Sequence, residues 1–192
     1  MTEVLAGIKA AETAGLTPIK LNTVVMRGIN DDEVADLAAL TFNKPYHVRF
    51  IELMPFRNDS CSDYNRLYLP IGEIIRKIPG IEQASVNTIL ENPGPARLCT
   101  LPGAKGKIGF IAPMSWHFCG SCDRLRLTAD GKIRSCLFSD HEMDVKALLR
   151  DGASKIELIE FFALVVKHKP SRHQISGNGC YKTGRGMYAI GG

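Results

Sequence analysis

The chain has 192 residues, of which 45% are hydrophobic and 23% are charged, and its formal net charge is +4. That size allows one large globular domain or two small ones. The small net charge does not predict nucleic-acid binding. The sequence contains no run of about 20 apolar residues, so it predicts no membrane span. Six cysteines, three of them close together, favour metal binding over a disulfide framework.

The first part of the chain predicts alternating helices and strands. Acidic side chains and a helical period at the start differ from a signal peptide, so we expect a cytoplasmic protein. Asp31 or Asp32 is expected to cap the second helix. The predicted elements are a helix over 2–14, a strand over 18–25, a helix over 34–40 and a strand over 46–53. Short connections between them are typical of a parallel sheet covered by helices.

Two residues of these strands are candidates for ligand binding. Lys20 lies within the first strand, and Met54 closes the second. In parallel α/β sheets the strand ends are where ligands bind. By residue type alone, Lys20 fits an edge position with its amine in water equally well, and Met54 fits the core better.

Residues 57 to about 97 are polar and irregular, with one helix predicted over 69–78. They connect the strand and helix part to a strand predicted over 105–112. Cys61 and Cys99 stand alone in or beside this segment, and we interpret both as ordinary free cysteines.

A β-hairpin is predicted over 124–137. Asp130-Gly131 lies there between two runs that alternate apolar and polar residues, which is among the stronger hairpin signals. A three-residue loop would place Cys136 opposite Arg124, and a two-residue loop would place it opposite Leu125. Both registers return Cys136 toward the residues that precede the hairpin.

Three cysteines around this hairpin, Cys119, Cys122 and Cys136, have the spacing C-x2-C-x13-C. Arg124 and Arg126 share one strand face because side chains alternate along a strand. The sequence therefore predicts a site for a soft metal beside fixed positive charge.

Three kinds of site remain open for these thiols. A structural zinc ion would need a fourth ligand, for which His117, His141, Cys99 or Cys180 could serve. An iron-sulfur cluster held by three thiolates would leave one iron open to a substrate. A redox C-x-x-C pair normally opens a helix, which this segment does not predict. The two arginines favour the cluster, because a structural zinc ion does not need cations beside its thiolates.

Two helices are predicted after the hairpin, over 143–149 and 154–168. The second is apolar over much of its circumference, so we expect it to be well buried. No acidic residue follows Glu160, and a basic segment favours an anionic small molecule such as a nucleotide phosphate. A solvated basic tail without a specific partner is the alternative. The glycine-rich tail through Gly191-Gly192 predicts no regular structure.

Several motifs together resemble the GTP 3′,8-cyclase family, also called molybdenum cofactor biosynthesis protein A, of the radical S-adenosylmethionine enzymes. They are the cysteine spacing, residues 122–132 (CDRLRLTADGK), Cys136-Leu137-Phe138, Arg49-Phe50-Ile51-Glu52-Leu53-Met54-Pro55 and the terminal Gly191-Gly192. The resemblance covers nearly the whole chain and is weakest over 58–97 and 173–181.

The resemblance implies an incomplete (β/α)6 barrel of the TIM type with two 4Fe-4S clusters. It implies that the C-terminal cluster is bound by Cys119, Cys122 and Cys136 and that GTP binds to its open iron. It also implies a conversion of GTP to 3′,8-cyclo-7,8-dihydroguanosine triphosphate that begins with cleavage of S-adenosylmethionine.

Roles for further residues follow from the same resemblance. Arg124, Leu125, Arg126 and Lys20 would contact GTP, and Met54 would line the S-adenosylmethionine site. The tail with Gly191 and Gly192 would enter the active site. Paired guanidinium groups suit phosphate oxygens, which agrees with this assignment.

The radical-generating C-x3-C-x2-C motif of the family is absent from these 192 residues, and position 115 is serine. We therefore expect the C-terminal part of such an enzyme, which alone does not cleave S-adenosylmethionine. Its expected partners are GTP and either an N-terminal half or a second copy of the chain, without nucleic acid or membrane. The alternatives are a zinc-ribbon interaction module and a nonfunctional fragment of a split gene.

The expected organisation has three regions. Residues 1–57 would form the last βα units of the partial barrel, and residues 58–104 a connecting segment. Residues 105–192 would form the iron-sulfur and GTP-binding region, with an antiparallel β-hairpin and two helices.

Overall fold

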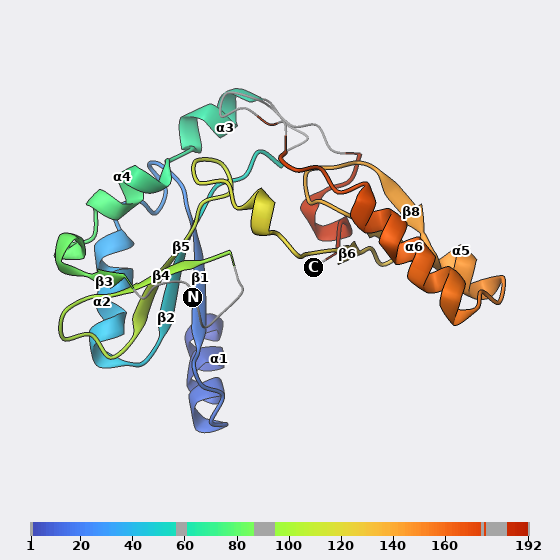
Figure 1. Ribbon diagram of the computed structural model, residues 1–192. Helices are drawn as coiled ribbons and strands as arrows, with labels where there is room; N and C mark the ends of the chain where they lie inside the picture. Colours follow the sequence, from blue (N-terminus) through green and yellow to red (C-terminus); the bar gives the residue numbers. More distant parts are fainter. Residues whose placement is uncertain (1, 57–60, 87–94, 174, 176–183, 192) are drawn as a thin grey trace. The chain divides into compact units, whose positions relative to one another are not determined.

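The computed structural model describes residues 2–56, 61–86, 95–173, 175 and 184–191 (Figure 1). The chain divides into two compact units. The first comprises Met1–Met54 and Arg66–Trp116, and the second comprises Pro55–Asn65 and His117–Gly192.

The first unit contains a five-stranded sheet in the order β1-β2-β5-β4-β3. Its strands are β1 (Lys20–Val25), β2 (His47–Glu52), β3 (Ser85–Val86), β4 (Arg97–Thr100) and β5 (Lys107–Ile111). The strands β1, β2 and β5 are parallel to one another. The strand β4 pairs with β5 in the antiparallel direction, and β3 pairs with β4 in the same way. The three strands predicted from the sequence are therefore confirmed, and β3 and β4 are additions within the expected connecting segment 58–104.

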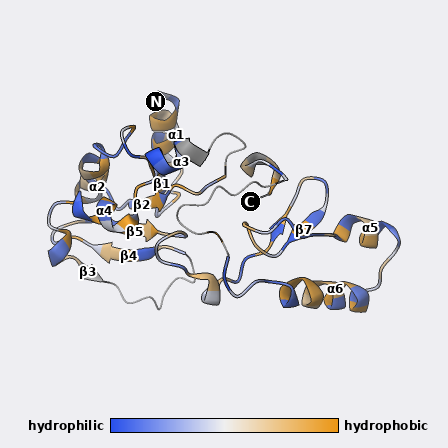
Figure 2. Ribbon diagram, turned by 90° about the horizontal axis from the view of Figure 1, so that it is seen from above, coloured by the Kyte–Doolittle hydropathy of each residue, from blue (hydrophilic) through white to orange (hydrophobic). Residues whose placement is uncertain are grey.

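Apolar side chains between the sheet and its helices form the core of this unit. The helices are α1 (Thr2–Thr13), α2 (Val34–Asn43), α4 (Ile71–Arg76) and the short η1 (Ile81–Gln83), while α3 (Cys61–Leu67) spans the division between the units. Val48, Phe50 and Ile108 are fully buried in this core, and β5 is strongly apolar in Figure 2. The alternating burial of β2 explains why its apolar residues could be recognised in the sequence.

One local prediction in this unit is wrong. The N-cap of α2 is Glu33, and it makes no side-chain capping bond. Asp31 instead accepts a hydrogen bond from the Gly28 N–H at 2.6 Å and pairs with Lys77 at 2.9 Å. A bond within the preceding turn and a long-range ion pair thus occupy the carboxylate that was expected to cap the helix.

The carboxylate of Glu52, at the end of β2, is fully buried and binds several backbone groups. It accepts hydrogen bonds from the N–H groups of Ile71 at 2.8 Å, Met114 at 2.9 Å and Ser115 at 3.0 Å, and from the Ser115 hydroxyl. One side chain therefore connects β2 to the start of α4 and to the loop after β5. It satisfies backbone donors that burial would otherwise leave unpaired.

The second unit contains a three-stranded antiparallel sheet in the order β6-β7-β8. Its strands are β6 (Arg126–Leu127), β7 (Lys132–Arg134) and β8 (Glu142–Asp144), and two 3-10 turns, η2 (Cys119–Ser121) and η3 (Met187–Ala189), flank them in the sequence. Two helices follow β8, namely α5 (Val145–Arg150) and α6 (Lys155–Lys167). The predicted hairpin and helix pair are confirmed, and β8 is a strand that the sequence did not predict.

The helix α6 begins with the predicted capping box between Ser154 and Glu157. Its expected burial is wrong, because only Val165 is buried, and it packs with Ile133 and Val145. Ile156 and Ile159 are 69% and 59% exposed, and Figure 2 shows apolar residues along this helix. Apolar residues indicate which faces of a helix can be buried, and in α6 the neighbouring elements of this unit bury only the face that contains Val165.

The fold is mixed α/β, with a parallel and antiparallel sheet in one unit and a separate antiparallel sheet in the other. Among the helices in the described part of the chain, none has the length and apolarity that a membrane span requires.

Candidate functional site

Local turns place the three predicted metal-binding thiols. Cys119 begins η2, and the Cys122 N–H donates to the Cys119 carbonyl at 3.1 Å, which folds this C-x2-C segment into a tight turn. Cys136 follows β7, and all three cysteines are free and partly buried. The hairpin therefore brings together thiols that are 14 to 17 positions apart in the sequence.

The hairpin register selects one of the two predicted alternatives. Arg126 pairs with Arg134, and Leu127 pairs with Ile133, so the loop has three residues. The Thr128 N–H donates to the Lys132 carbonyl at 2.9 Å and closes this loop. The strands are shorter than predicted, because both Arg124 and Cys136 lie outside them.

The three thiols influence one another electrostatically. Burial raises the pKa of Cys136, a hydrogen bond from the Phe138 backbone N–H lowers it, and the nearby Cys119 and Cys122 raise it again. Thiolates that repel one another in a partly buried turn are stabilised by a bound cationic centre. Backbone N–H donors to sulfur are also a feature of iron-sulfur sites. The donor set therefore fits a cluster held by three thiolates.

Positive charge surrounds these sulfur atoms. Burial lowers the pKa of the half-buried Arg126, and the neighbouring Arg124 lowers it further, whereas the thiols of Cys136 and Cys122 raise it. The Arg124 guanidinium is exposed and lies 5.6 Å from the centre of the Phe118 ring. The partly desolvated guanidinium of Arg126, with the exposed guanidinium of Arg124 near it, favours an anion at this position.

The C-terminal segment contacts one of these arginines. The Arg126 Nη1 donates to the Gly191 carbonyl at 2.6 Å, and Ile190 next to it is fully buried. Gly191 has a φ of +83°, and a Cβ added there would lie 2.0 Å from the Leu127 carbonyl oxygen. The backbone of β6 and this glycine therefore approach each other too closely for any other residue. Gly192 lies outside the described residues.

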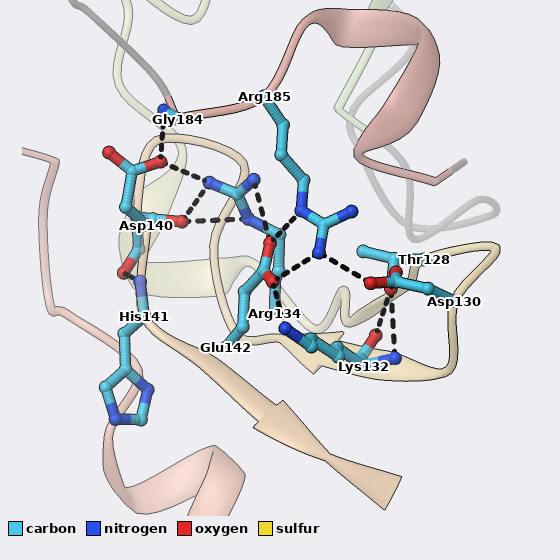
Figure 3. A network of polar contacts seen from close by, with 10 residues as sticks. Thr128, Asp130, Lys132, Arg134, Asp140, His141, Glu142, Gly184 and Arg185 are labelled. Carbon is cyan, nitrogen blue, oxygen red and sulfur yellow. Dashed lines mark hydrogen bonds and ion pairs between the residues drawn. The ribbon is translucent and has the colours of Figure 1, made fainter. Parts of the chain in front are cut away.

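Arg134 is fully buried, and acidic groups and a carbonyl surround its guanidinium (Figure 3). Its Nε donates to the Ser139 carbonyl at 2.9 Å, and its Nη atoms contact Asp140 at 3.0 Å and Glu142 at 3.5 Å. These contacts compensate a buried charge that stands directly opposite Arg126 in the ladder.

Arg185 connects the C-terminal segment to the same network (Figure 3). It contacts Asp130 in the hairpin loop at 2.7 Å and Glu142 on β8 at 2.8 Å. Hydrogen bonds from Arg185 and Thr128 hold the pKa of Asp130 well below its ordinary value. The network therefore attaches the segment that precedes Gly191 to the β6-β7-β8 sheet.

A second group of possible metal ligands lies beside the first cysteine. In the described part of the chain, the donor atoms of His117, Cys119 and His173 all lie within 4.8 Å of one another. The His117 Nδ1 and the His173 Nε2 are 3.0 Å apart. His117 was a candidate ligand in the sequence, but His173 was not, because nothing in the spacing relates residues that are 56 positions apart.

Among the described residues, the candidate ligands His141 and Cys99 do not belong to this group. His141 stacks on His168, with ring centres 5.4 Å apart. Cys99 is buried in β4 of the first unit, where burial raises the pKa of its thiol to about 11, and it is free as predicted. Cys180 lies outside the described residues, and so does the side chain of Cys61.

Lys20 and Met54 belong to the first unit, whereas the three clustered cysteines, Arg124, Leu125 and Arg126 belong to the second. Lys20 begins β1 with an exposed side chain, and Met54 follows β2 and is partly buried. Leu125 is partly buried and packs on the core of the second unit. The ligand roles of these three residues stay predictions.

Comparison with known proteins places the chain. It is 47% identical over 192 residues to the GTP 3′,8-cyclase of Moorella thermoacetica, in an alignment that covers 100% of this chain and 58% of that protein. It is 46% identical to that of Heliobacterium modesticaldum, with 99% and 58% covered, and 43% identical to that of Alkaliphilus metalliredigens, with 100% and 58% covered. The chain thus spans about 58% of the length of these relatives. Residues 46–175 match the family described as Molybdenum Cofactor Synthesis C, and the chain belongs to this family.

Proposed function

We propose that this chain provides the GTP-binding part of a GTP 3′,8-cyclase of molybdenum cofactor biosynthesis. The reaction would convert GTP to 3′,8-cyclo-7,8-dihydroguanosine triphosphate by radical S-adenosylmethionine chemistry. The relatives named GTP 3′,8-cyclase support this proposal, and the observation that carries it is the half-buried Arg126 beside three interacting thiols.

The metal centre of this proposal is a 4Fe-4S cluster bound by Cys119, Cys122 and Cys136. When bound, it would supply a Lewis-acidic iron to which GTP can bind. The sequence has no C-x3-C-x2-C motif. S-adenosylmethionine and the second cluster would therefore depend on ligands from an N-terminal half, because a second copy of this chain lacks the motif as well.

The residues of this chain would bind and orient the substrate. Arg124 and Arg126 offer guanidinium donors that suit triphosphate oxygens, and burial strengthens the contact of Arg126 with an anion. Leu125 would contribute its backbone between them. Lys20 would add a further positive charge, and Met54 would line the S-adenosylmethionine site.

The remaining parts of the proposal concern the fold and the tail. The parallel strands β1, β2 and β5 would be the last strands of an incomplete (β/α)6 barrel, within the expected division into residues 1–57, 58–104 and 105–192. The tail with Gly191 and Gly192 would lie at the substrate site, which the contact between Gly191 and Arg126 supports. The compartment would be the cytoplasm.

Anaerobic reconstitution with iron and sulfide tests the cluster, followed by GTP titration. We expect brown protein with about four irons per chain that binds GTP. The variant Arg126→Ala should weaken GTP binding about tenfold to a hundredfold at unchanged iron content, because it removes a charge-assisted hydrogen bond.

Arg150→Ala is the matched control, since Arg150 is an exposed arginine in the last turn of α5 of the same unit. Its affinity for GTP should equal that of the parent. A chain that takes up no iron, or an Arg126→Ala variant with unchanged GTP affinity, would contradict the proposed function.

A further inference from the structure

Two imidazole nitrogens and one thiol converge at the start of the cysteine turn. The donor atoms of His117, Cys119 and His173 lie within 4.8 Å of one another, and Cys122 and Cys136 are not members of this group. Two nitrogens and one sulfur around a tetrahedral zinc ion lie about 3.3 to 3.5 Å apart, given bonds of about 2.0 Å to nitrogen and 2.3 Å to sulfur. The group would therefore need to contract by about 1 Å around a single ion.

The two histidine nitrogens already lie close to the separation that a bound ion requires, so the contraction concerns the sulfur. The His117 Nδ1 and the His173 Nε2 are 3.0 Å apart, and the rings meet edge to face with centres 4.6 Å apart. A hydrogen bond between the two nitrogens also explains this distance. It does not explain the third donor, the Cys119 sulfur, within reach of both nitrogens.

Aromatic packing holds the ring of His173 in place. His173 is only 7% exposed, and its ring lies 4.7 Å from the ring of Phe138, which stacks on Phe56 at 4.8 Å and 5°. A ligand that packing holds in place loses little conformational entropy when it binds a metal ion. His173, the ligand that the sequence did not predict, is thus preorganised for metal binding.

We propose that His117, Cys119 and His173 form a site for one divalent ion of the zinc class, which shares only Cys119 with the proposed cluster. Two imidazoles and one thiolate are borderline-soft donors that suit zinc, and three protein ligands leave a fourth position for water. Binding releases the proton of the Cys119 thiol to solvent, and both facing nitrogens present lone pairs to the ion.

Sharing of Cys119 has a consequence for the cluster. A thiolate bound to zinc is not available to iron, so occupancy of one site excludes the other. This part of the inference rests on the proposed function, whereas the zinc site by itself does not. Zinc would then hold the turn closed in a chain that has no cluster.

Metal titration of the cluster-free chain under anaerobic conditions tests the site, with cobalt(II) as the spectroscopic probe and zinc as competitor. We expect one cobalt per chain, with thiolate charge-transfer absorption and the intense d-d bands of a tetrahedral ion. Loss of a histidine ligand in His117→Ala or His173→Phe should weaken binding on the order of a hundredfold or more, since loss of an outer-shell partner already costs up to that much. The phenylalanine keeps an aromatic ring against Phe138, and far-UV circular dichroism checks the fold.

Three control variants should keep the parent's affinity for cobalt. Cys122→Ser and Cys136→Ser remove thiols outside the group, and His141→Ala removes a histidine that stacks on His168 elsewhere in the same unit. The proposal is overturned if Cys136→Ser loses cobalt while His173→Phe retains it, because the ion would then lie among the three thiols. Absence of thiolate absorption in the parent also overturns it.

The competition is measured as iron uptake during reconstitution with and without equimolar zinc. Zinc should slow uptake in the parent and leave His173→Phe unaffected. Equal slowing in both chains overturns the sharing of Cys119. A parent chain that binds cobalt at this site but never takes up iron contradicts the proposed function and leaves the zinc site intact, so the two failures are distinguishable.

Discussion

Replacement of Gly191 by alanine should detach the C-terminal segment from the hairpin without unfolding the unit. A Cβ at this position would lie 2.0 Å from the carbonyl oxygen and 2.7 Å from the carbonyl carbon of Leu127. Both atoms belong to β6, whose ladder with β7 holds them in place. A φ of +83° adds roughly 1 to 2 kcal/mol for any residue with a side chain.

The contacts of the segment limit the size of the effect. Undocking loses the charged hydrogen bond from Arg126 to Gly191, at about 1.5 to 3 kcal/mol, and the burial of Ile190, at about 1.5 to 3 kcal/mol. Release of the segment therefore costs about 3 to 6 kcal/mol. We expect release because the other way to relieve the clash is to displace β6 from its ladder with β7. We expect the docked population to fall by about a hundredfold or more, since each 1.4 kcal/mol is tenfold.

Hydrogen exchange of a peptide covering residues 187–191, followed by mass spectrometry, measures this change. The N–H groups of Ala189 and Ile190 bond within the η3 turn and report on docking. Exchange should be about a hundredfold faster in Gly191→Ala, with little change in the peptides of β7. Gly184→Ala is the control, because a Cβ there meets no atom within 4 Å, and it should exchange like the parent. Equal exchange rates in Gly191→Ala and the parent would refute the reasoning.

Three further predictions concern stability and reactivity. Glu52→Gln should lower the free energy of unfolding by about 2 to 4 kcal/mol in urea denaturation, because it replaces a buried acceptor of several N–H groups. The control Glu73→Gln, at an exposed ion pair, should change it by less than about 1 kcal/mol. Equal effects of the two substitutions would contradict the role of Glu52. Since hydrogen bonds from Arg185 and Thr128 lower the pKa of Asp130 in the folded state, its contribution is complete above its ordinary pKa of 3.8 and is lost as the pH falls further. The stability difference between the parent and Asp130→Asn should shrink below about pH 4, and a constant difference would argue against the contact. Burial raises the pKa of Cys99 to about 11, so iodoacetamide at pH 8 should label this thiol only after unfolding. Peptide mass spectrometry measures the labelling, and rapid labelling of the native chain would be inconsistent with this burial.

Local patterns in the sequence were sufficient for elements whose stability depends on near neighbours. The capping box of α6 joins Ser154 to a glutamate three positions away, and the hairpin loop around Asp130-Gly131 is equally local. The parallel strands β1, β2 and β5 were recognised because each is a strand-length run that contains β-branched or aromatic residues.

Elements that depend on distant partners were missed. The strand β8 is three residues long and contains two acids, so it has no apolar pattern, and only pairing with β7 makes it a strand. The exposure of Ile156 and Ile159 was also not predictable, since periodicity indicates an apolar face but not whether another element covers it.

The sequence by itself determined the cysteine spacing, the paired arginines and the family resemblance, because these are properties of short segments. Only the tertiary structure decided that His173 reaches His117 and Cys119 and that Gly191 lies on Arg126. It also decided that acidic groups surround the buried Arg134, while Arg126 is held by a carbonyl in the partly desolvated space beside the thiols. These contacts join residues far apart in the chain, and packing selects them among many that the sequence allows.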